Sequence, residues 1–484
     1  MDFELLLILP VVCLTAYGLL CLLLLPVLRD NGRGLAVVSL IGLAITGFSL
    51  FRLWQGWLMF GVRTTAFGMV RIDGLGLFFS FILLAATILT VLASITFLER
   101  EQADQGEFYS LVLLCLAGMF VMLHTTHLMV ILIGLEIFSL SLYVLTGLTR
   151  GRRQSVEAAL KYFLLGAFSS GFIVYGLALL FGATGSLDLS RIGQVATADP
   201  SALLWVGLGL VLVGLAFKIA IVPFHQWVPD VYQGAPTNVT GFMAAATKTA
   251  VFAVLLRVLL GAFGEQSELW IPLIKWLAIA TMTVANLVAL AQTNIKRLLA
   301  FSSIAHAGYL LIAVVCTPES GIAAVLFYLT IYVFMTIGAF AVLSAVGRGD
   351  SESEQGYMID DWSGLGWKHP MLGLAMVLFL VSLAGIPPTG GFLGKYVIFQ
   401  SAIQSGQYLL AVVGVVNAAI AAYYYLRIIV AMYLREAESD ERPLLPVSPS
   451  TAVVMMVSVA GVLYLGLAPG RILALVQTLT RALV

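Results

Sequence analysis

Charged side chains lie in the middle of apolar segments that are long enough to cross a membrane. Lys218 follows VLVGLAF, Lys248 lies in GFMAAATKTAVF, and Glu136 lies in LMVILIGLEIFSLSLYVL. A charge at the centre of a bilayer costs about 3 kcal/mol or more, so it persists only where it has partners or water. Glu136 could be a packing device that is hydrogen-bonded to Ser139, but charges at this depth more often mark an ion path. The pattern therefore indicates ion transport.

Glu136 and Lys218 are the pair that could control the binding and release of a proton. Each is a mid-membrane charge without an opposite charge on its own segment. A carboxylate near an ammonium keeps the ammonium protonated, and a longer distance between them favours release. We predict that the two residues act as one unit that passes protons toward Lys248.

Prolines are expected to break two of the apolar spans. Pro223 follows Lys218 in FKIAIVPFHQWVPD, and Pro387 and Pro388 lie in GIPPTGG shortly before Lys395. Proline removes an amide donor, and the carbonyls that it frees must be satisfied by protein or water at membrane depth. We interpret Lys395 as a relay residue rather than a surface anchor, because no wet end of the span lies nearby.

Further polar residues are candidates for accessory proton relay. Glu157 and Lys161 are spaced i, i+4, so they could equally form a plain intrahelical ion pair. His225 and His306 lie in or beside apolar spans, where a neutral histidine can pass a proton between its two nitrogens or be a satisfied core residue.

The composition excludes a soluble globular domain. Of the 484 residues, 61% are hydrophobic and 10% are charged, and the mean hydropathy is +1.03. The 25 basic and 25 acidic residues balance, so no nucleic-acid partner is expected. The four cysteines occur singly, and the sequence contains no Walker A or dinucleotide motif, so no metal or cofactor site is expected in this chain.

The apolar spans predict an all-α polytopic membrane protein with about fourteen transmembrane helices. The seventh and twelfth spans are the two broken ones. The expected spans are 4–27, 34–55, 74–98, 107–123, 126–148, 154–183, 202–222, 238–261, 269–292, 295–316, 320–346, 370–404, 408–434 and 449–475.

Basic residues concentrate in the odd-numbered loops, which predicts the orientation of the chain. By the positive-inside rule these loops are cytoplasmic, and both termini face the periplasm. Lys296 and Arg297 are interpreted as anchors of this kind. The odd loops carry Arg29, Arg33, Arg100, Arg150, Arg152, Arg153, Lys296, Arg297, Arg348, Lys368, Arg435 and Arg442, whereas the even loops carry Arg63, Arg71 and Arg191.

The two broken spans lie five spans apart, and Gly-Leu-Ala before the first break matches Ser-Leu-Ala before the second. Because five is odd, two units of five helices would be inverted in the membrane, an arrangement typical of transport sites. We predict one membrane domain, 1–484. It consists of three N-terminal helices within residues 1–100, repeats 107–261 and 269–435, and a last helix 449–475.

Three longer stretches resemble a known family. FKIAIVPFHQWVPDVYQGAP, ALAQTNIKRLLAFSSIAHAGY and SLAGIPPTGGFLGKY are similar to the antiporter-like subunits of proton-pumping NADH:quinone oxidoreductase, respiratory complex I. The similarity covers essentially the whole chain. It is greatest to subunit N, the counterpart of mitochondrial subunit 2, because Lys395 replaces the glutamate of subunit M and no long lateral C-terminal helix, as in subunit L, is expected.

The resemblance implies a charged axis along the membrane midplane, formed by Glu136, Lys218, Lys248 and Lys395, with His225 and Lys161 as accessory members. It further implies that the chain translocates protons in a bacterial inner membrane while other membrane-arm subunits surround it. NADH, FMN, iron–sulfur clusters and quinone are then expected in partner subunits. The alternatives are a sodium/proton antiporter subunit without redox coupling and a scaffold. The chain has one deep glutamate and at least three deep lysines, and this ratio favours proton transport over sodium transport.

Overall fold

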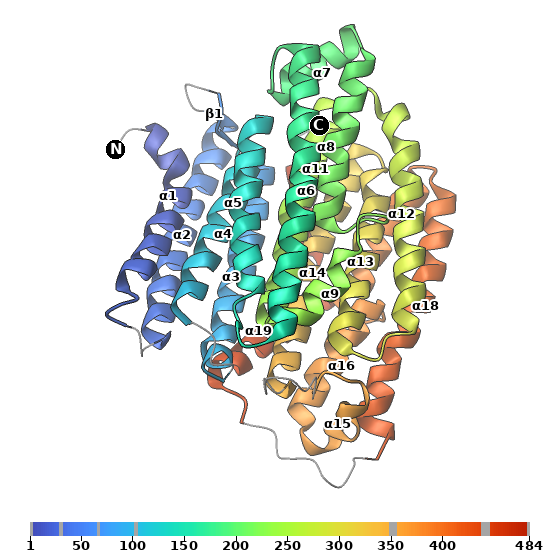
Figure 1. Ribbon diagram of the computed structural model, residues 1–484. Helices are drawn as coiled ribbons and strands as arrows, with labels where there is room; N and C mark the ends of the chain where they lie inside the picture. The colour runs from blue at the N-terminus through green and yellow to red at the C-terminus, as the bar shows by residue number, and fades with distance from the viewer. Residues whose placement is uncertain are drawn as a thin grey trace.

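The computed structural model describes residues 3–28, 32–64, 68–100, 105–347, 356–436 and 446–481. Long helices run side by side through the molecule, and the hairpin of β1 (Arg63–Thr64) and β2 (Arg71–Ile72) lies at the upper end in Figure 1. Within the described residues, 13 helices are long and apolar enough to cross a membrane, or up to 14 with one bent pair counted as a span. The predicted all-α polytopic membrane fold is confirmed.

The first six spans follow the predicted segments closely. They are α1 (Phe3–Leu24), α2 (Gly32–Phe60), α3 (Gly74–Arg100), α4 (Gln105–Leu123), α5 (Leu128–Thr146) and α6 (Arg153–Thr184). A short helix without a predicted counterpart, α7 (Leu189–Ala198), follows at the upper end of Figure 1, where Asp188 caps it. Of the loop charges that predict orientation, Arg29, Arg348 and Arg442 lie outside the described residues.

The seventh span is broken, as predicted, but its first half ends before the predicted boundary. Helix α8 (Ala202–Ile219) stops where Ala220 takes a left-handed backbone with φ 62°, and α9 (Trp227–Gly234) begins after the proline-containing loop. The predicted boundary at residue 222 is wrong, because the chain leaves the helix before the proline. The amide of Val222, freed by the break, donates to Thr281 Oγ1 at 3.1 Å. Protein groups thus satisfy backbone that hydrocarbon could not.

The twelfth span is also broken where it was predicted to be. Helix α16 (Pro370–Ala384) ends at Gly385, whose φ of 85° favours glycine, and α17 (Gly390–Gln404) starts after Pro387 and Pro388. The boundaries of the two inverted units stay a prediction.

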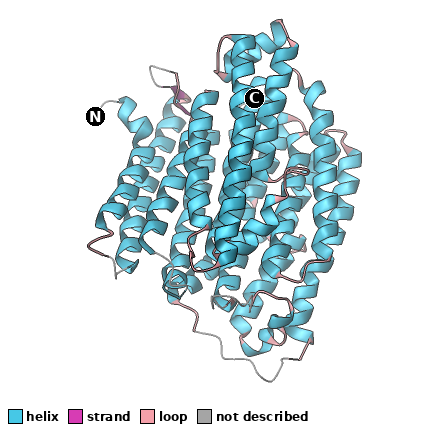
Figure 2. Cartoon of the chain, viewed as in Figure 1, coloured by secondary structure: helices cyan, strands magenta, loops and turns pink. Residues whose placement is uncertain are grey.

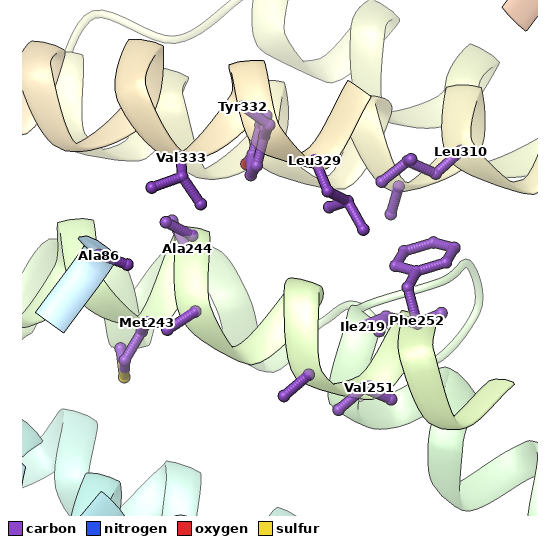
Figure 3. Packing of buried hydrophobic residues seen from close by; sticks show 14 of the residues in the cluster. Ala86, Ile219, Met243, Ala244, Val251, Phe252, Leu310, Leu329, Tyr332 and Val333 are labelled. Atoms are coloured by element: carbon purple, nitrogen blue, oxygen red, sulfur yellow. The ribbon is translucent and has the colours of Figure 1, made fainter. Parts of the chain in front are cut away.

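The eighth span is continuous but contains two π-helical turns. Its segments are α10 (Thr237–Phe242), η1 (Met243–Thr247), α11 (Lys248–Leu256) and η2 (Arg257–Ala262). Figure 3 shows Tyr332 and Val333 of α14 (Pro318–Val346) over Ala244 of η1, where the small side chain leaves room for the neighbouring helix. Single π turns inside α-helices often occur at functional sites, and η1 ends directly before Lys248.

The remaining elements complete the bundle, and Figure 2 shows how completely helices dominate it. The elements are α12 (Ser267–Leu290), α13 (Ile295–Val314), η3 (Asp360–Trp362), α15 (Leu365–Lys368), α18 (Tyr408–Leu434), α19 (Pro449–Leu467) and α20 (Gly470–Arg481). The prediction of one last helix over 449–475 is wrong: Ala468 leaves the helical conformation before Pro469, and the separate helix α20 packs on α14.

The centre of the bundle consists of the eighth span, α13 and α14, which are almost wholly buried. The outer helices α1, α2, α6, α12, α18 and α19 instead expose many apolar side chains, as expected where lipid or partner helices surround a membrane protein. A charge in the middle of one of these helices is therefore far from water, and Lys248 is such a charge.

Candidate functional site

Lys218 lies at the end of α8, directly before the first break, and is 2% exposed. Its Nζ donates to Ser139 Oγ at 2.8 Å and to Tyr143 Oη at 3.1 Å, and both acceptors are on α5. The ring of Tyr143 also lies within 5.5 Å of the ammonium. The lysine is thus held by neutral side-chain oxygens that belong to another helix.

Glu136 lies on the same helix as those two acceptors but does not form an ion pair with Lys218. Its carboxylate accepts a hydrogen bond from Ser170 Oγ of α6 at 2.5 Å, and Ser139 donates to Leu135 O. Within this described helix, the hydrogen bond between Glu136 and Ser139 that the sequence offered as an alternative is therefore absent as well. The carboxylate acts on the lysine only through space in this conformation, so the predicted pair is open rather than closed.

Lys248 begins α11 and is 2% exposed at the centre of the bundle. Its Nζ donates to the carbonyl oxygen of Ser303 at 2.5 Å and also contacts Ser303 Oγ. Tyr332 of α14 donates to the same hydroxyl at 3.0 Å. Lys248 is therefore joined to a hydroxyl pair contributed by the two other central helices.

His306, one helical turn further along α13, lies inside a cluster of hydroxyl groups. Its Nδ1 contacts Tyr328 Oη, its Nε2 lies 3.2 Å from Tyr425 Oη, and Tyr425 Oη also contacts Ser302 Oγ. Each of these side chains is buried. The predicted accessory histidine thus bridges two tyrosines between the Lys248 and Lys395 regions.

Sequence reasoning missed the hydroxyl groups of this cluster. The tyrosines carry no charge at neutral pH, so their membrane depth did not single them out. A usable signal was present in FSSIAH, where two serines and a histidine recur at helical spacing, and in YLTIY, where two tyrosines are spaced i, i+4.

Lys395 follows the second break and is 4% exposed. Its Nζ donates to the carbonyl oxygens of Leu383 and Ala384, each at 2.9 Å, and lies 4.9 Å from the centre of the Tyr309 ring. These carbonyls end α16, so the break itself supplies the acceptors. A cavity of about 460 Å³, lined by Lys395 and Gly385 among others, opens beside the side chain.

Lys218, Lys248 and Lys395 share one electrostatic property. In the described part of the chain, none of these ammonium groups forms an ion pair; each is held by hydroxyl or carbonyl oxygens. A buried lysine in neutral surroundings can exchange its proton, whereas a lysine locked to a carboxylate keeps it.

The accessory residues on the first repeat lie in a different environment. Lys161 is 42% exposed and forms ion pairs with Glu157 and Asp230, each at 2.8 Å, while Arg297 lies 2.7 Å from the second oxygen of Asp230. Lys161 and Glu157 thus form the i, i+4 ion pair that the sequence offered as an alternative. His225 lies half-buried in the first break, and its Nδ1 has no partner among the described residues.

Lys296 is not the surface anchor that its position suggested. Its side chain is 1% exposed, and its Nζ donates to Ala235 O, at the end of α9, at 2.5 Å. The Tyr357 ring covers it at 5.1 Å. The pair Lys296 and Arg297 therefore holds the middle and the C-terminal end of α9, a role that the charge count of a loop could not predict.

Comparisons with known proteins agree with this geometry. The family described as "NADH:quinone oxidoreductase/Mrp antiporter, TM" matches residues 125–421, which include the four charges of the predicted axis. The protein named NADH-quinone oxidoreductase subunit N from Trichlorobacter lovleyi is 45% identical, over 97% of this chain and 96% of its own length.

Two solved structures have the same fold as this chain. A chain of respiratory complex I from Thermus thermophilus, solved with bound aureothin, is 39% identical with a TM-score of 0.80, over 96% of this chain and 98% of that one. A chain of the Mrp complex from Dietzia sp. DQ12-45-1b, at 24% identity and a TM-score of 0.81 over 97% of both chains, shares the fold alone. The chain therefore belongs to the NADH:quinone oxidoreductase/Mrp antiporter family and, within it, to the group of relatives named subunit N.

Proposed function

We propose that this chain is the proton-translocating subunit N of the membrane arm of an NADH:quinone oxidoreductase. The observation that carries the proposal is that Lys218, Lys248 and Lys395 are buried, two of them at helix breaks and one at the centre, and that each is held by neutral oxygens. Burial of these three charges is costly, and ionisable residues at such depth typically mark ion or proton paths. The similarity to subunit N identifies the process that they serve.

In the proposed mechanism Lys218, Lys248 and Lys395 receive and release protons in turn. An approach of Glu136 toward Lys218 stabilises the ammonium, and its withdrawal to Ser170 favours transfer of the proton toward Lys248. From Ser303 the proton passes to the hydroxyl cluster around His306. Water bridges the gaps between these side chains, and the cavity beside Lys395 gives the last lysine space to exchange its proton.

Glu157, Lys161 and His225 lie on the first-repeat side of this route. We propose that Lys161 and Glu157 deliver protons from the aqueous end, because they are half-exposed, and that His225 accepts them inside the break. The Nδ1 of His225, which has no partner among the described residues, supports this role, since an unpartnered buried nitrogen can accept a proton.

The chemistry of electron transfer belongs, in this proposal, to partner subunits that hold NADH, FMN, iron–sulfur clusters and quinone. The isolated chain should then oxidise no NADH and reduce no quinone, whereas the assembled complex should do both. Assays of the purified subunit and of the complex test this assignment, and redox turnover by the isolated subunit would contradict it.

We propose that the chain lies in the bacterial inner membrane with both termini in the periplasm. The N and C labels of Figure 1 both lie toward the end opposite α15, which agrees with the distribution of basic loops. Cysteines at the exposed positions Asp199 and Gly151 provide the test. An impermeant thiol reagent added to whole cells with a permeable outer membrane should label Asp199→Cys and not Gly151→Cys; the opposite pattern would reverse the topology.

The second candidate function is sodium/proton antiport without redox coupling. Its support is the fold shared with the Mrp complex, but a sodium path needs several carboxylate or carbonyl ligands, and Glu136 is the one deep glutamate that we predicted. Proton transport by the reconstituted complex in sodium-free buffer decides between the two. Undiminished transport supports the proton path, and a requirement for sodium supports the antiporter.

A further inference from the structure

We propose that Asp230 is a positioning residue that couples the Lys218 site to the Lys248 site by holding α9 to two helices at once. This inference rests on the proposed function, because it concerns the same two lysines. It assigns a role to a carboxylate and an arginine that neither the charged axis nor the accessory relay includes.

Helix α9 is an eight-residue segment that is detached from its neighbours on both sides. The first break separates it from α8, and extended backbone at Ala235 and Pro236 separates it from α10. A helix this short has little stability of its own, so the contacts that it makes at its two ends set its position.

At the aqueous end, Asp230 accepts from two cations on different parts of the bundle. Lys161 of α6 reaches one carboxylate oxygen at 2.8 Å, and Arg297 of α13 reaches the other at 2.7 Å. Arg297 also donates to Gln233 Oε1 at 3.1 Å. One carboxylate thus links the first predicted repeat to the second through α9.

On the inner side, Trp227 connects α9 to the surroundings of Lys218. Its indole stacks on Tyr162 with centroids 4.5 Å apart and an angle of 9°, and its Nε1 donates to Phe217 O, the residue before Lys218, at 3.1 Å. Tyr162 in turn packs edge-on against Tyr143, an acceptor for the Lys218 ammonium. A displacement of α9 therefore changes the packing around Phe217 and Tyr143, both of which lie next to Lys218.

Arg297 provides the connection to the second lysine. It lies in the first turns of α13, the helix that carries Ser303 and His306, and Ser303 is the partner of Lys248. A movement of α13 that draws Arg297 away pulls on Asp230, and α9 transmits the pull to Trp227. The same connection works in reverse when α8 moves.

Lys161 has a second partner, which makes the connection adjustable. Glu157, on the same helix, also lies 2.8 Å from Lys161 Nζ, so Lys161 can exchange Asp230 for Glu157 without becoming unpaired. A cavity of about 180 Å³ beside these groups has room for several waters at about 30 Å³ each. Release of Asp230 by Lys161 would leave this carboxylate attached to α13 alone.

The test is hydrogen–deuterium exchange of the intact complex, followed by mass spectrometry of the peptide that covers residues 220–226. Asp230→Asn should speed exchange in this break by about threefold to tenfold, the effect of losing two partly exposed ion pairs. Exchange in the second break, residues 385–389, should not change. Asp188→Asn, which removes a carboxylate at the opposite end of the bundle, is the matched control and should leave the first break unchanged.

Proton transport per electron gives the second readout. Asp230→Asn should lower the ratio at least about twofold while NADH oxidation continues, and Asp230→Glu should restore most of it, because the charge is kept. If Asp230→Asn prevents assembly, Arg297→Gln, which removes one of the two holds, should give a smaller increase in exchange at the same peptide.

Unchanged exchange at residues 220–226 in an assembled variant would overturn the proposal, as would faster exchange with an unchanged transport ratio. The exchange measurement does not depend on the role of Lys218. If Lys218 proves dispensable for pumping while exchange responds as expected, the proposed function fails and the mechanical link remains.

Discussion

The two broken spans hold their lysines in opposite ways. Lys218 precedes its break and is bound by side chains of α5, the helix that also carries Glu136. Lys395 follows its break and is bound by two carbonyls of its own span. The first lysine therefore senses the position of a neighbouring helix, whereas the second is fixed by the backbone around it.

In the proposed mechanism this difference separates a switching site, at Lys218, from a receiving site, at Lys395. A hydroxyl acceptor on another helix moves when that helix moves, and Glu136 moves with it. Carbonyl acceptors at a helix end stay where the break leaves them and carry the partial negative charge of the helix C-terminus. Under this proposal, the first break controls proton release, and the second break keeps the proton affinity of its lysine constant.

The largest effect is expected from the lysine and carboxylate at the switching site. Lys218→Ala should abolish or strongly reduce proton transport with assembly intact, and Glu136→Gln should do much the same by removing the carboxylate that controls it. Glu136→Asp should keep partial activity. Because both residues serve one step, the double variant should cost little more than the worse single variant.

Transport in membrane vesicles, with assembly checked on native gels, measures these variants. Strictly additive losses would show that Glu136 and Lys218 act independently. Normal transport by an assembled Lys218→Ala complex would remove the switching site from the path.

A smaller loss is expected from a backbone change at the receiving site. Gly385 has a φ of 85°, and a Cβ there would lie 2.8 Å from Cδ of Lys395. Gly385→Ala should therefore displace the lysine from its carbonyls and add about 1–2 kcal/mol of backbone strain, with a severalfold fall in transport. Gly209→Ala on α8, where a Cβ meets nothing within 4 Å, is the control and should transport normally. Equal transport rates of the two variants would mean that the carbonyl oxygens of Leu383 and Ala384 are unimportant for transport.

Removal of one hydroxyl distinguishes the two sites more finely. Tyr143→Phe deletes an acceptor of Lys218 but leaves Ser139, so we expect a loss of about 1 kcal/mol, or roughly a fivefold slower step. Tyr309→Phe keeps the ring that Lys395 faces and should change little. The turnover-limited transport rate of each assembled complex is the measurement. A larger loss in Tyr309→Phe than in Tyr143→Phe would invert the comparison.

The smallest effect is expected at the aqueous side of the first break. Glu157→Gln removes one of two carboxylates at Lys161, and a partly exposed i, i+4 pair is worth about 0.3–0.5 kcal/mol. Because Lys161 keeps Asp230 as a partner and can still deliver protons, thermal stability should stay close to wild type and transport should fall by less than about twofold. A severalfold loss of transport would instead make Glu157 an obligatory relay residue.

Much of the fold could be predicted from the sequence because apolar length and proline position are local signals. The two breaks appear beside Pro223 and the Pro387–Pro388 pair, where proline removes an amide donor from the backbone. The last span was predicted too long, because the residues around Pro469 are apolar and a count of apolar residues alone predicts a continuous helix there. The π turns of the eighth span were not predicted, because a count of apolar residues does not distinguish them from α-helix.

The site was predictable in its charges and not in their partners. Lys218, Lys248 and Lys395 stand out because ammonium groups are rare in apolar segments. Their acceptors are serines, tyrosines and carbonyls, which are common and uncharged, so only the packing of helices selects them. For the same reason Lys296 resembled a loop cation, although it reaches inward to a carbonyl at the end of α9.

The central claim, that protons cross the bundle through its buried lysines, depends most on Lys248, which lies between the two breaks. The measurement is the number of protons transported per electron by the purified complex in proteoliposomes, for wild type and for Lys248→Met, which keeps the side-chain volume. Lys275→Met, a change of a half-buried lysine on α12, serves as the control. We predict a ratio for Lys248→Met well below that of both wild type and control at full assembly, and an undiminished ratio would contradict the claim.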